Sequence, residues 1–225
     1  MKEQYTQSFY EKYLQGSYYS ANTIIGWLSN YIRPETVIDF GCGSGAWLKV
    51  AQETFGSQIL GIDQHRYKDI HMLINESEYI MHDLTKPLHL RKNFDFAISV
   101  EVAEHINSKY SDVFVETLCN HSDVILFSAA IPMQGGTGHI NEQPCSYWAK
   151  KFSQHGYYAI DCLRPALWNN ENIEIWYINN VILYVSEQNA KNILSCKIDS
   201  FNYPLDIIHP KMLEKIVENI TKKFG

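Results

Sequence analysis

The stretch DFGCGSG, residues 39–45, constrains the fold more than any other part of the chain. Three glycines stand at alternate positions, after an aspartate and the β-forming residues TVI. Glycine weakens a strand and a helix alike, so this cluster predicts a place where the backbone comes close to a ligand. The next residues, AWLKVAQETF, predict a helix that ends at Gly56. The sequence therefore predicts a strand, a ligand-binding turn and a helix.

Strands and helices alternate along most of the remaining chain. We expect strands at residues 36–40, 58–63, 78–83, 94–100, 123–132, 157–163 and 175–185. We expect helices at residues 20–32, 45–56, 108–121 and 141–156, and a terminal helix after residue 201. Such alternation predicts a mainly parallel sheet with helices on both faces and the last strand antiparallel, near an edge. Ligands bind beyond the carboxyl ends of such strands, where residues 39–45 would lie.

The domain organisation follows from this pattern. We expect one domain over residues 1–195, whose residues 1–33 form a helical lid, and a C-terminal helical extension over residues 196–225. The five cysteines are scattered and form no CxxC pair, which predicts reduced thiols rather than disulfides or a zinc site. No apolar run approaches the roughly 20 residues that span a bilayer, and the N-terminus has no signal-like region. A soluble cytoplasmic protein without a membrane partner is expected.

Two nucleotide-binding interpretations fit the glycine turn. Gly41, Gly43 and Ala46 satisfy the GxGxxA pattern of dinucleotide binding, with Asp63 20 residues after Gly43. Residues 39–45 also satisfy DxGxGxG, which suits S-adenosylmethionine. The charge of Asp39 favours the second interpretation, because a carboxylate repels a pyrophosphate and attracts a cationic amino group.

Acidic residues follow the next two expected strands. Asp63 is placed to accept hydrogen bonds from both ribose hydroxyls, and Gln64 follows it directly. Asp83 is placed to accept from the adenine amino group, while the Leu84 backbone meets the ring edge. The predicted cofactor-binding set is Asp39, Gly41, Gly43, Gly45, Asp63, Gln64, Asp83 and Leu84.

Four segments together resemble the motif series of class I S-adenosylmethionine-dependent methyltransferases: VIDFGCGSGAWL, GIDQH, HDLTKPL and FDFAISVEVAEHI. The resemblance covers most of residues 20–187 and implies a Rossmann-like α/β fold with a seven-stranded sheet whose last strand is reversed. The segments GGTGHINEQPCSYWAKKF and PLDIIHP are similar to bacterial methyltransferases associated with glycan or natural-product assembly.

The catalytic residues are expected after the fourth and fifth strands. Methyl transfer to a hydroxyl needs alignment and a base, or a metal that lowers the pKa of the hydroxyl. His139, in the segment GTGHINEQ, is the first candidate for the base, and His105, in EVAEH, is the second. Glu101, also in EVAEH, is the third predicted catalytic residue. Asn141 is expected to cap the helix that Pro144 starts.

A metal site is the alternative. Glu101, Glu104, His105 and His139 are similar to the magnesium-binding pattern of ubiquinone-biosynthesis O-methyltransferases and small-RNA 2′-O-methyltransferases. Such ligands suit Mg²⁺ or Mn²⁺. The same EH pair is common in family members that bind no metal, so we favour the metal-free base.

These features predict methyl transfer from S-adenosylmethionine to an oxygen of a small molecule, a saccharide or a secondary metabolite. The aromatic and amide side chains of residues 164–177 suit a sugar. No (N/D)PPY motif follows the fourth strand, which argues against methylation of amines and nucleic-acid bases. An RNA 2′-O-methyltransferase remains an alternative, weakened by the net charge of −6. A nicotinamide-dependent oxidoreductase and a non-catalytic cofactor-binding protein are the others, and the oligomeric state is left open.

Overall fold

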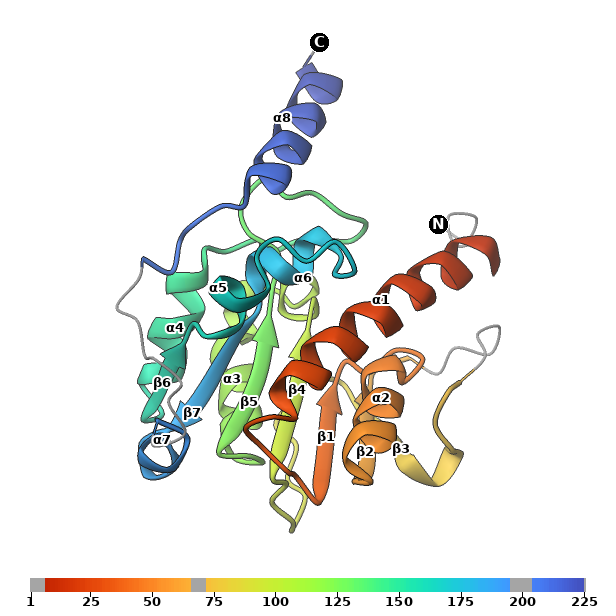
Figure 1. The fold of residues 1–225 in the computed structure, drawn as a ribbon, viewed down its shortest axis with the longest axis vertical. Coiled ribbons are helices and arrows are strands. Elements are labelled where there is room, and N and C mark those ends of the chain that lie inside the picture. Colours follow the sequence, from red (N-terminus) through yellow and green to blue (C-terminus); the bar gives the residue numbers. More distant parts are fainter. Residues whose placement is uncertain (1–6, 66–71, 195–203, 225) are drawn as a thin grey trace.

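The computed structural model describes residues 7–65, 72–194 and 204–224 and shows a sheet flanked by helices (Figure 1). The strands are β1 (Thr36–Phe40), β2 (Gln58–Asp63), β3 (Tyr79–Met81), β4 (Phe96–Val100), β5 (Val124–Ser128), β6 (Tyr157–Ile160) and β7 (Ile182–Ser186). They form one seven-stranded sheet in the order β3-β2-β1-β4-β5-β7-β6. Strand β7 runs antiparallel to both β5 and β6, and every other pair of neighbouring strands is parallel. The predicted Rossmann-like sheet with a reversed last strand is confirmed, and β7 lies next to the edge strand β6.

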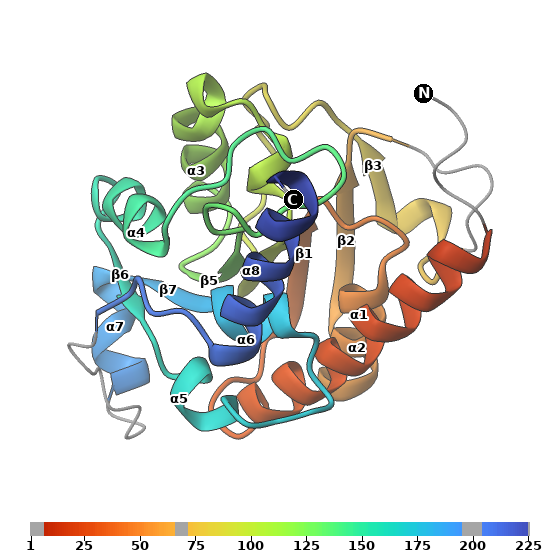
Figure 2. The same ribbon diagram turned by 90° about the horizontal axis from the view of Figure 1, so that it is seen from above.

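Helices cover both faces of the sheet. They are α1 (Gln7–Leu28), α2 (Ala46–Phe55), α3 (Ser111–Cys119), α4 (Cys145–Ser153), α5 (Leu163–Leu167), α6 (Ile175–Asn180), α7 (Glu187–Leu194) and α8 (Pro210–Phe224), with 3₁₀ turns η1 (Glu76–Glu78), η2 (Ala103–His105) and η3 (Ser108–Tyr110). One buried cluster joins α1, α2 and α5 to one face of the sheet. A second cluster joins α3 and α4 to the other face (Figure 2).

Some predicted boundaries were wrong. The segment 175–180, expected as the start of the last strand, is helix α6. A short apolar run does not by itself distinguish a buried helix from a buried strand. Helix α1 begins at Gln7 and ends at Leu28, and α4 begins at Cys145, directly after Pro144. The sequence interpretation missed α5 and α7, and the expected terminal helix is α8.

Helix α8 stands beyond the carboxyl ends of the parallel strands (Figures 1 and 2). Its buried residues Met212 and Ile216 pack in a small cluster with Ile131 and Cys145. The segment after β5 thus lies between the sheet and α8. Residues 1–6 of the predicted lid and 196–203 of the predicted extension lie outside the described residues. Among the described helices, none is long and apolar enough to cross a membrane.

Candidate functional site

The glycine turn after β1 has the backbone that the sequence predicts. Gly41 and Gly45 both have φ of 86°, in the left-handed region. A Cβ atom at Gly41 would lie 2.4 Å from the side chain of Val102, which follows β4. A Cβ atom at Gly43 would meet no atom within 4 Å. Gly41 therefore allows two loops to pack together, while Gly43 faces open space beside the turn.

Two buried acids lie at this turn. Asp39 is 2% exposed and Asp63 is 6% exposed. The Gly43 N–H donates to Asp63 Oδ2 at 2.9 Å, and the His65 N–H donates to Asp63 Oδ1 at 3.0 Å. Burial, followed by repulsion from Asp63, raises the pKa of Asp39 well above its usual value. A cationic ligand group is favoured next to this pair of acids.

The other predicted cofactor residues lie after β2 and β3. Gln64 is exposed directly after β2. Asp83 accepts hydrogen bonds from the backbone N–H and the hydroxyl of Thr85, at 3.0 and 2.6 Å. These bonds, with a smaller contribution from Lys86, lower the pKa of Asp83 to about 2. Leu84 is buried. Asp83 thus stabilises the turn at residues 83–85. Its contact with adenine stays a prediction.

The two predicted histidines meet beyond the carboxyl ends of β4 and β5. The ring centroids of His105 and His139 are 5.0 Å apart and their planes are nearly perpendicular. His105 Nδ1 lies 3.2 Å from the Gly138 carbonyl oxygen, and His139 Nε2 lies 3.9 Å from Glu104 Oε1. Desolvation, followed by the neighbouring His139, lowers the pKa of His105. This environment favours the neutral form of His105.

Glu104 is the unusual member of this group. Its side chain is fully buried, and neither carboxylate oxygen has a hydrogen-bond partner among the described residues. Burial, followed by repulsion from Glu101, raises its pKa well above the usual value. A buried carboxylate without a partner is costly, so Glu104 either carries a proton or faces a cation.

Three of the four predicted metal ligands come together. One ligand atom each from Glu104, His105 and His139 lie within 4.8 Å of one another. A carboxylate and two imidazoles suit a divalent ion such as Mn²⁺. The fourth residue, Glu101, is bound elsewhere, to the side chains of Ser128, Gln134 and Asn180. The buried, unpartnered Glu104 therefore fits a cation, while Glu101 is not part of the group as it stands.

His139 has a partner that the sequence interpretation did not include. Its Nδ1 atom lies 3.0 Å from Glu142 Oε1. The backbone N–H groups of Met133 and Gly135 also donate to this carboxylate, at 2.9 and 2.8 Å. Glu142 is thereby fixed in one orientation, and it directs Nε2 of His139 towards Glu104. The spacing of three residues between His139 and Glu142 was the available signal.

The predicted cap at Asn141 is wrong. Asn141 is 3% exposed, and its amide donates to the Ala103 carbonyl and the Ser111 hydroxyl at 3.3 and 3.2 Å. The N–H groups of Ile140 and Asn141 both donate to the Glu104 carbonyl oxygen. The Asn141 side chain forms these tertiary hydrogen bonds instead of capping α4, whose N-cap residue is Pro144. Asn141 therefore fastens the His139 loop to the segment after β4.

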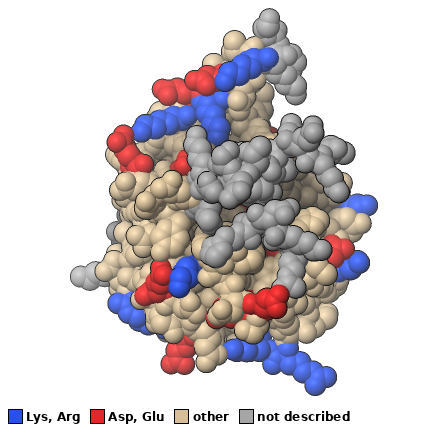
Figure 3. All heavy atoms as spheres, turned by 90° about the vertical axis from the view of Figure 1, so that its right-hand side faces the viewer, with Lys and Arg blue, Asp and Glu red and all other residues tan. Residues whose placement is uncertain are grey.

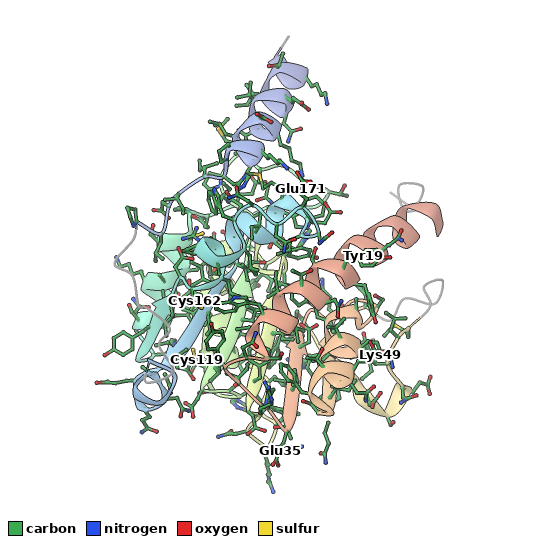
Figure 4. The ribbon with its side chains drawn as sticks, viewed as in Figure 1. Tyr19, Glu35, Lys49, Cys119, Cys162 and Glu171 are labelled. Atoms are coloured by element: carbon green, nitrogen blue, oxygen red, sulfur yellow. The ribbon has the colours of Figure 1, made fainter. Side chains whose placement is uncertain are left out.

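A separate open hollow lies on the surface, and none of the residues of the His105–His139 centre line it. It lies between α1 and the segment before α6, and its lining includes Tyr19, Glu171 and Glu174. In Figure 4, Tyr19 and Glu171 lie below helix α8 and well above Glu35, which lies at the lower end of the molecule.

Residues 17–128 match the Methyltransf_23 family, described as a methyltransferase domain. No curated protein sequence matches the chain. The sugar N-methyltransferase KedS8 from Streptoalloteichus has a similar structure, with a TM-score of 0.59 and 10% identity over 80% of this chain and 91% of that chain. Magnesium protoporphyrin IX methyltransferase ChlM from Synechocystis, with bound S-adenosylhomocysteine, has a TM-score of 0.55 and 15% identity over 83% and 90%. DesVI from Streptomyces venezuelae has a TM-score of 0.54 and 11% identity over 79% and 96%.

Proposed function

We propose that this chain, a class I S-adenosylmethionine-dependent methyltransferase, transfers the methyl group to a hydroxyl oxygen of a small polyhydroxylated molecule, a saccharide or a related secondary metabolite. The observation that carries the oxygen target is the His139–Glu142 pair beside His105, beyond the carboxyl ends of β4 and β5. A hydroxyl is a weak nucleophile at neutral pH and needs a base, which an amine already in its neutral form does not.

The proposed base has the orientation that the reaction requires. Because Glu142 accepts from Nδ1 of His139, the lone pair lies on Nε2, which faces Glu104 and His105. When Nε2 takes the proton of the acceptor hydroxyl, the carboxylate of Glu142 stabilises the charged ring. His105 lies against the same ring and contributes to the shape of the acceptor site. We assign His139 as the base and Glu142 as the residue that positions it.

The cofactor pocket complements this centre. Asp39 and Asp63 are proposed to receive the cationic amino group and the ribose hydroxyls, and Gly43 leaves room for the methionine tail. Val102 packs against Gly41, so the segment that carries Glu101 and Glu104 lies directly beside the cofactor turn. Alignment of the methyl group with the acceptor oxygen is the main contribution of such a site.

A metal-assisted form of the same reaction is the second candidate, and Glu104 is the observation that favours it. Glu104, His105 and His139 would hold the ion. When bound, a divalent cation would lower the pKa of the acceptor hydroxyl. In that form His139 is a ligand, so it cannot also be the base. We favour the metal-free form, because His139 already has an orienting carboxylate.

Two observations support a polyhydroxylated acceptor. KedS8, a structural neighbour, is named as a sugar N-methyltransferase. The hollow lined by Tyr19, Glu171 and Glu174 offers an aromatic ring and carboxylates, which suit a polyhydroxylated ligand. The segment 164–177 contributes less than its composition suggested. Trp168 packs on His209, and Lys215 covers the ring of Trp176.

An RNA acceptor is disfavoured by charge. Among the described residues on the face in Figure 3, basic and acidic side chains are interspersed, without an extended basic patch. Together with the net charge of −6, this differs from the basic surface typical of nucleic-acid binding.

The test is turnover of S-adenosylmethionine by the purified protein with a panel of sugars, nucleotide sugars, hydroxylated aromatic compounds, the corresponding amino sugars and short RNA. We expect S-adenosylhomocysteine to accumulate with a hydroxylated acceptor, and the product spectrum to show a methyl carbon bonded to oxygen. Methylation of amino sugars alone would overturn the oxygen target. Turnover with short RNA alone would overturn the small-molecule acceptor.

A further inference from the structure

Glu101 has an unusual backbone and a crowded side chain. Its φ is 56°, a left-handed conformation that is rare for a residue other than glycine. Its carboxylate accepts hydrogen bonds from the Ser128 hydroxyl at 2.9 Å, the Gln134 amide at 3.1 Å and the Asn180 amide at 3.1 Å. Sparsely populated conformations persist where the surroundings fix them, and they gather at functional sites. These three donors fix the side chain of Glu101.

One chain of hydrogen bonds leads from Glu101 to the start of α8. The His209 N–H, directly before α8, donates to Asn179 Oδ1 at 2.7 Å. The Asn179 amide donates to Asn180 Oδ1 at 2.7 Å, and the Asn180 amide donates to Glu101. His209, Asn179 and Asn180 are all at most 6% exposed.

A second chain leads from Glu101 to the third turn of α8. The Asn219 amide donates to the Gln134 carbonyl oxygen at 2.9 Å, and the Gln134 side chain donates to Glu101. The two chains are joined, because the Asn180 amide also donates to Gln134 Oε1 at 2.9 Å. Gln134 is 3% exposed. Helix α8 is therefore attached to the support of Glu101 at two points.

We propose that Asn180 and Gln134 are positioning residues that fix the Glu101 carboxylate, and that helix α8 stabilises the catalytic centre through them. A buried amide costs free energy unless each of its polar atoms has a hydrogen-bond partner. Breaking one bond of this chain therefore weakens the whole network. Loss of either hydrogen bond to α8 leaves one amide group of the chain without its partner. The Glu101 carboxylate is then held less firmly in its orientation. In this proposal α8 helps to fix the orientation of the Glu101 carboxylate, so it is more than a C-terminal extension.

Other charged groups face Glu101 without replacing this support. Glu104 lies on the same segment after β4, and the charges of the two carboxylates repel each other. Lys215 of α8 lies 4.5 Å from the centroid of the Trp176 ring, and its charge is attracted by Glu101 and Glu174. Helix α8 thus brings a cation to the same side of the centre, and the amides supply the direct hydrogen bonds.

The first test needs no acceptor. Hydrogen–deuterium exchange is measured on the full chain for Asn179→Ala and Asn219→Ala, whose side chains hydrogen-bond to His209, Asn180 and Gln134 and not to residues 100–106. We expect exchange in residues 100–106 to rise about fivefold, as the loss of one buried hydrogen bond worth about 1 kcal/mol implies. Exchange in β2 should not change. Thr221→Ala, on the exposed side of α8, should leave both segments unchanged. Unaltered exchange in residues 100–106 in both variants overturns the coupling.

The second test rests on the proposed function and uses whichever acceptor the panel identifies. Asn180→Ala should lower kcat while the affinity for S-adenosylhomocysteine stays the same, and it should add no further loss in a Glu101→Ala background. Additive losses would overturn the positioning role. Full turnover by Glu101→Ala alone would refute only the sequence-based prediction that Glu101 takes part in catalysis, since the exchange result does not depend on that prediction. Asn93→Ala, an exposed residue at the opposite end of the sheet, is the control.

Discussion

Nδ1 of His139 lies 3.0 Å from Oε1 of Glu142, and that carboxylate is held by two backbone N–H groups. A glycine-rich loop thus contains one fixed carboxylate–imidazole pair. The two residues are only three positions apart, so the conformation of this one loop sets the orientation of the His139 ring. A free histidine in such a loop would have no fixed ring orientation.

Replacement of Glu142 tests this pair. Glu142→Gln keeps the size of the side chain but removes the charge that stabilises the protonated His139 ring. We expect kcat to fall roughly 10- to 100-fold, from the loss of a charge-assisted hydrogen bond worth about 1.5–3 kcal/mol. The affinity for S-adenosylhomocysteine, measured by calorimetry, should stay the same. Glu214→Gln, on the exposed side of α8, is the matched control. Undiminished turnover in Glu142→Gln would remove Glu142 from the mechanism.

Asp63 tests the cofactor pocket. Asp63→Ala should weaken binding of S-adenosylhomocysteine by about 1.5–3 kcal/mol, the usual range for hydrogen bonds to a charged group. Part of the loss would come through Gly43, whose N–H donates to Asp63 in the unliganded chain. The wild-type protein should show no binding of NAD in the same calorimeter. An affinity unchanged by Asp63→Ala would move the ribose contact to another residue.

Two glycines offer a comparison on stability. In Gly41→Ala, the new methyl group would lie 2.4 Å from a Val102 carbon, at a φ of 86°. Gly26 lies inside α1, and a Cβ atom there would meet nothing within 4 Å. We expect Gly26→Ala to raise the free energy of unfolding by about 0.5–1 kcal/mol and Gly41→Ala to lower it by more than that amount. Urea denaturation measures both. Equal effects of the two substitutions would contradict the close packing of Gly41.

The sequence predicted the sheet well because its strands carry local signals. The buried runs in β1, β4 and β5 are apolar and stand between turn residues, and the glycine turn marks the first crossover. Helix α6 was assigned wrongly, because Tyr177 and Ile178 are buried whether the segment is helical or extended. Tertiary contacts accompany the helical conformation: Tyr177 packs on Trp47, and its hydroxyl forms a hydrogen bond with the Ser17 hydroxyl.

The candidate site was predictable in part. Glu104, His105 and His139 follow adjacent parallel strands, so their meeting follows from topology. The support of Glu101 was not predictable, because Gln134 and Asn180 come from segments 33 and 79 residues away. Amides in loops and short helices look ordinary in a sequence. Only the fold shows that these two are buried against a carboxylate.

Asp83 gives a dependence on pH. Its pKa in the folded chain is lowered to about 2, chiefly by Thr85. A lowered pKa contributes stability above the usual value of about 4, and this contribution is lost as the pH falls from about 4 to about 2. In the unliganded protein, Asp83→Asn should be slightly less stable than wild type at pH 7, and the difference should shrink below about pH 4 and vanish below about pH 2. The effect is small because the side chain is partly exposed and water screens it. A constant difference across this range, measured by urea denaturation, would contradict the assignment.

Chelation decides between the two forms of the reaction. In the metal-free form, EDTA leaves turnover unchanged, Mn²⁺ does not raise the melting temperature, and His139→Ala lowers kcat roughly 10²- to 10⁴-fold. We expect this result, because Glu142 already orients His139 as a base. In the metal form, EDTA abolishes turnover, and Mn²⁺ restores it and raises the melting temperature of the wild type but not of Glu104→Gln. Glu53→Gln, on the exposed surface of α2, is the control for charge. Full turnover in His139→Ala after EDTA treatment would contradict both forms and leave alignment of the methyl group as the whole contribution of the site.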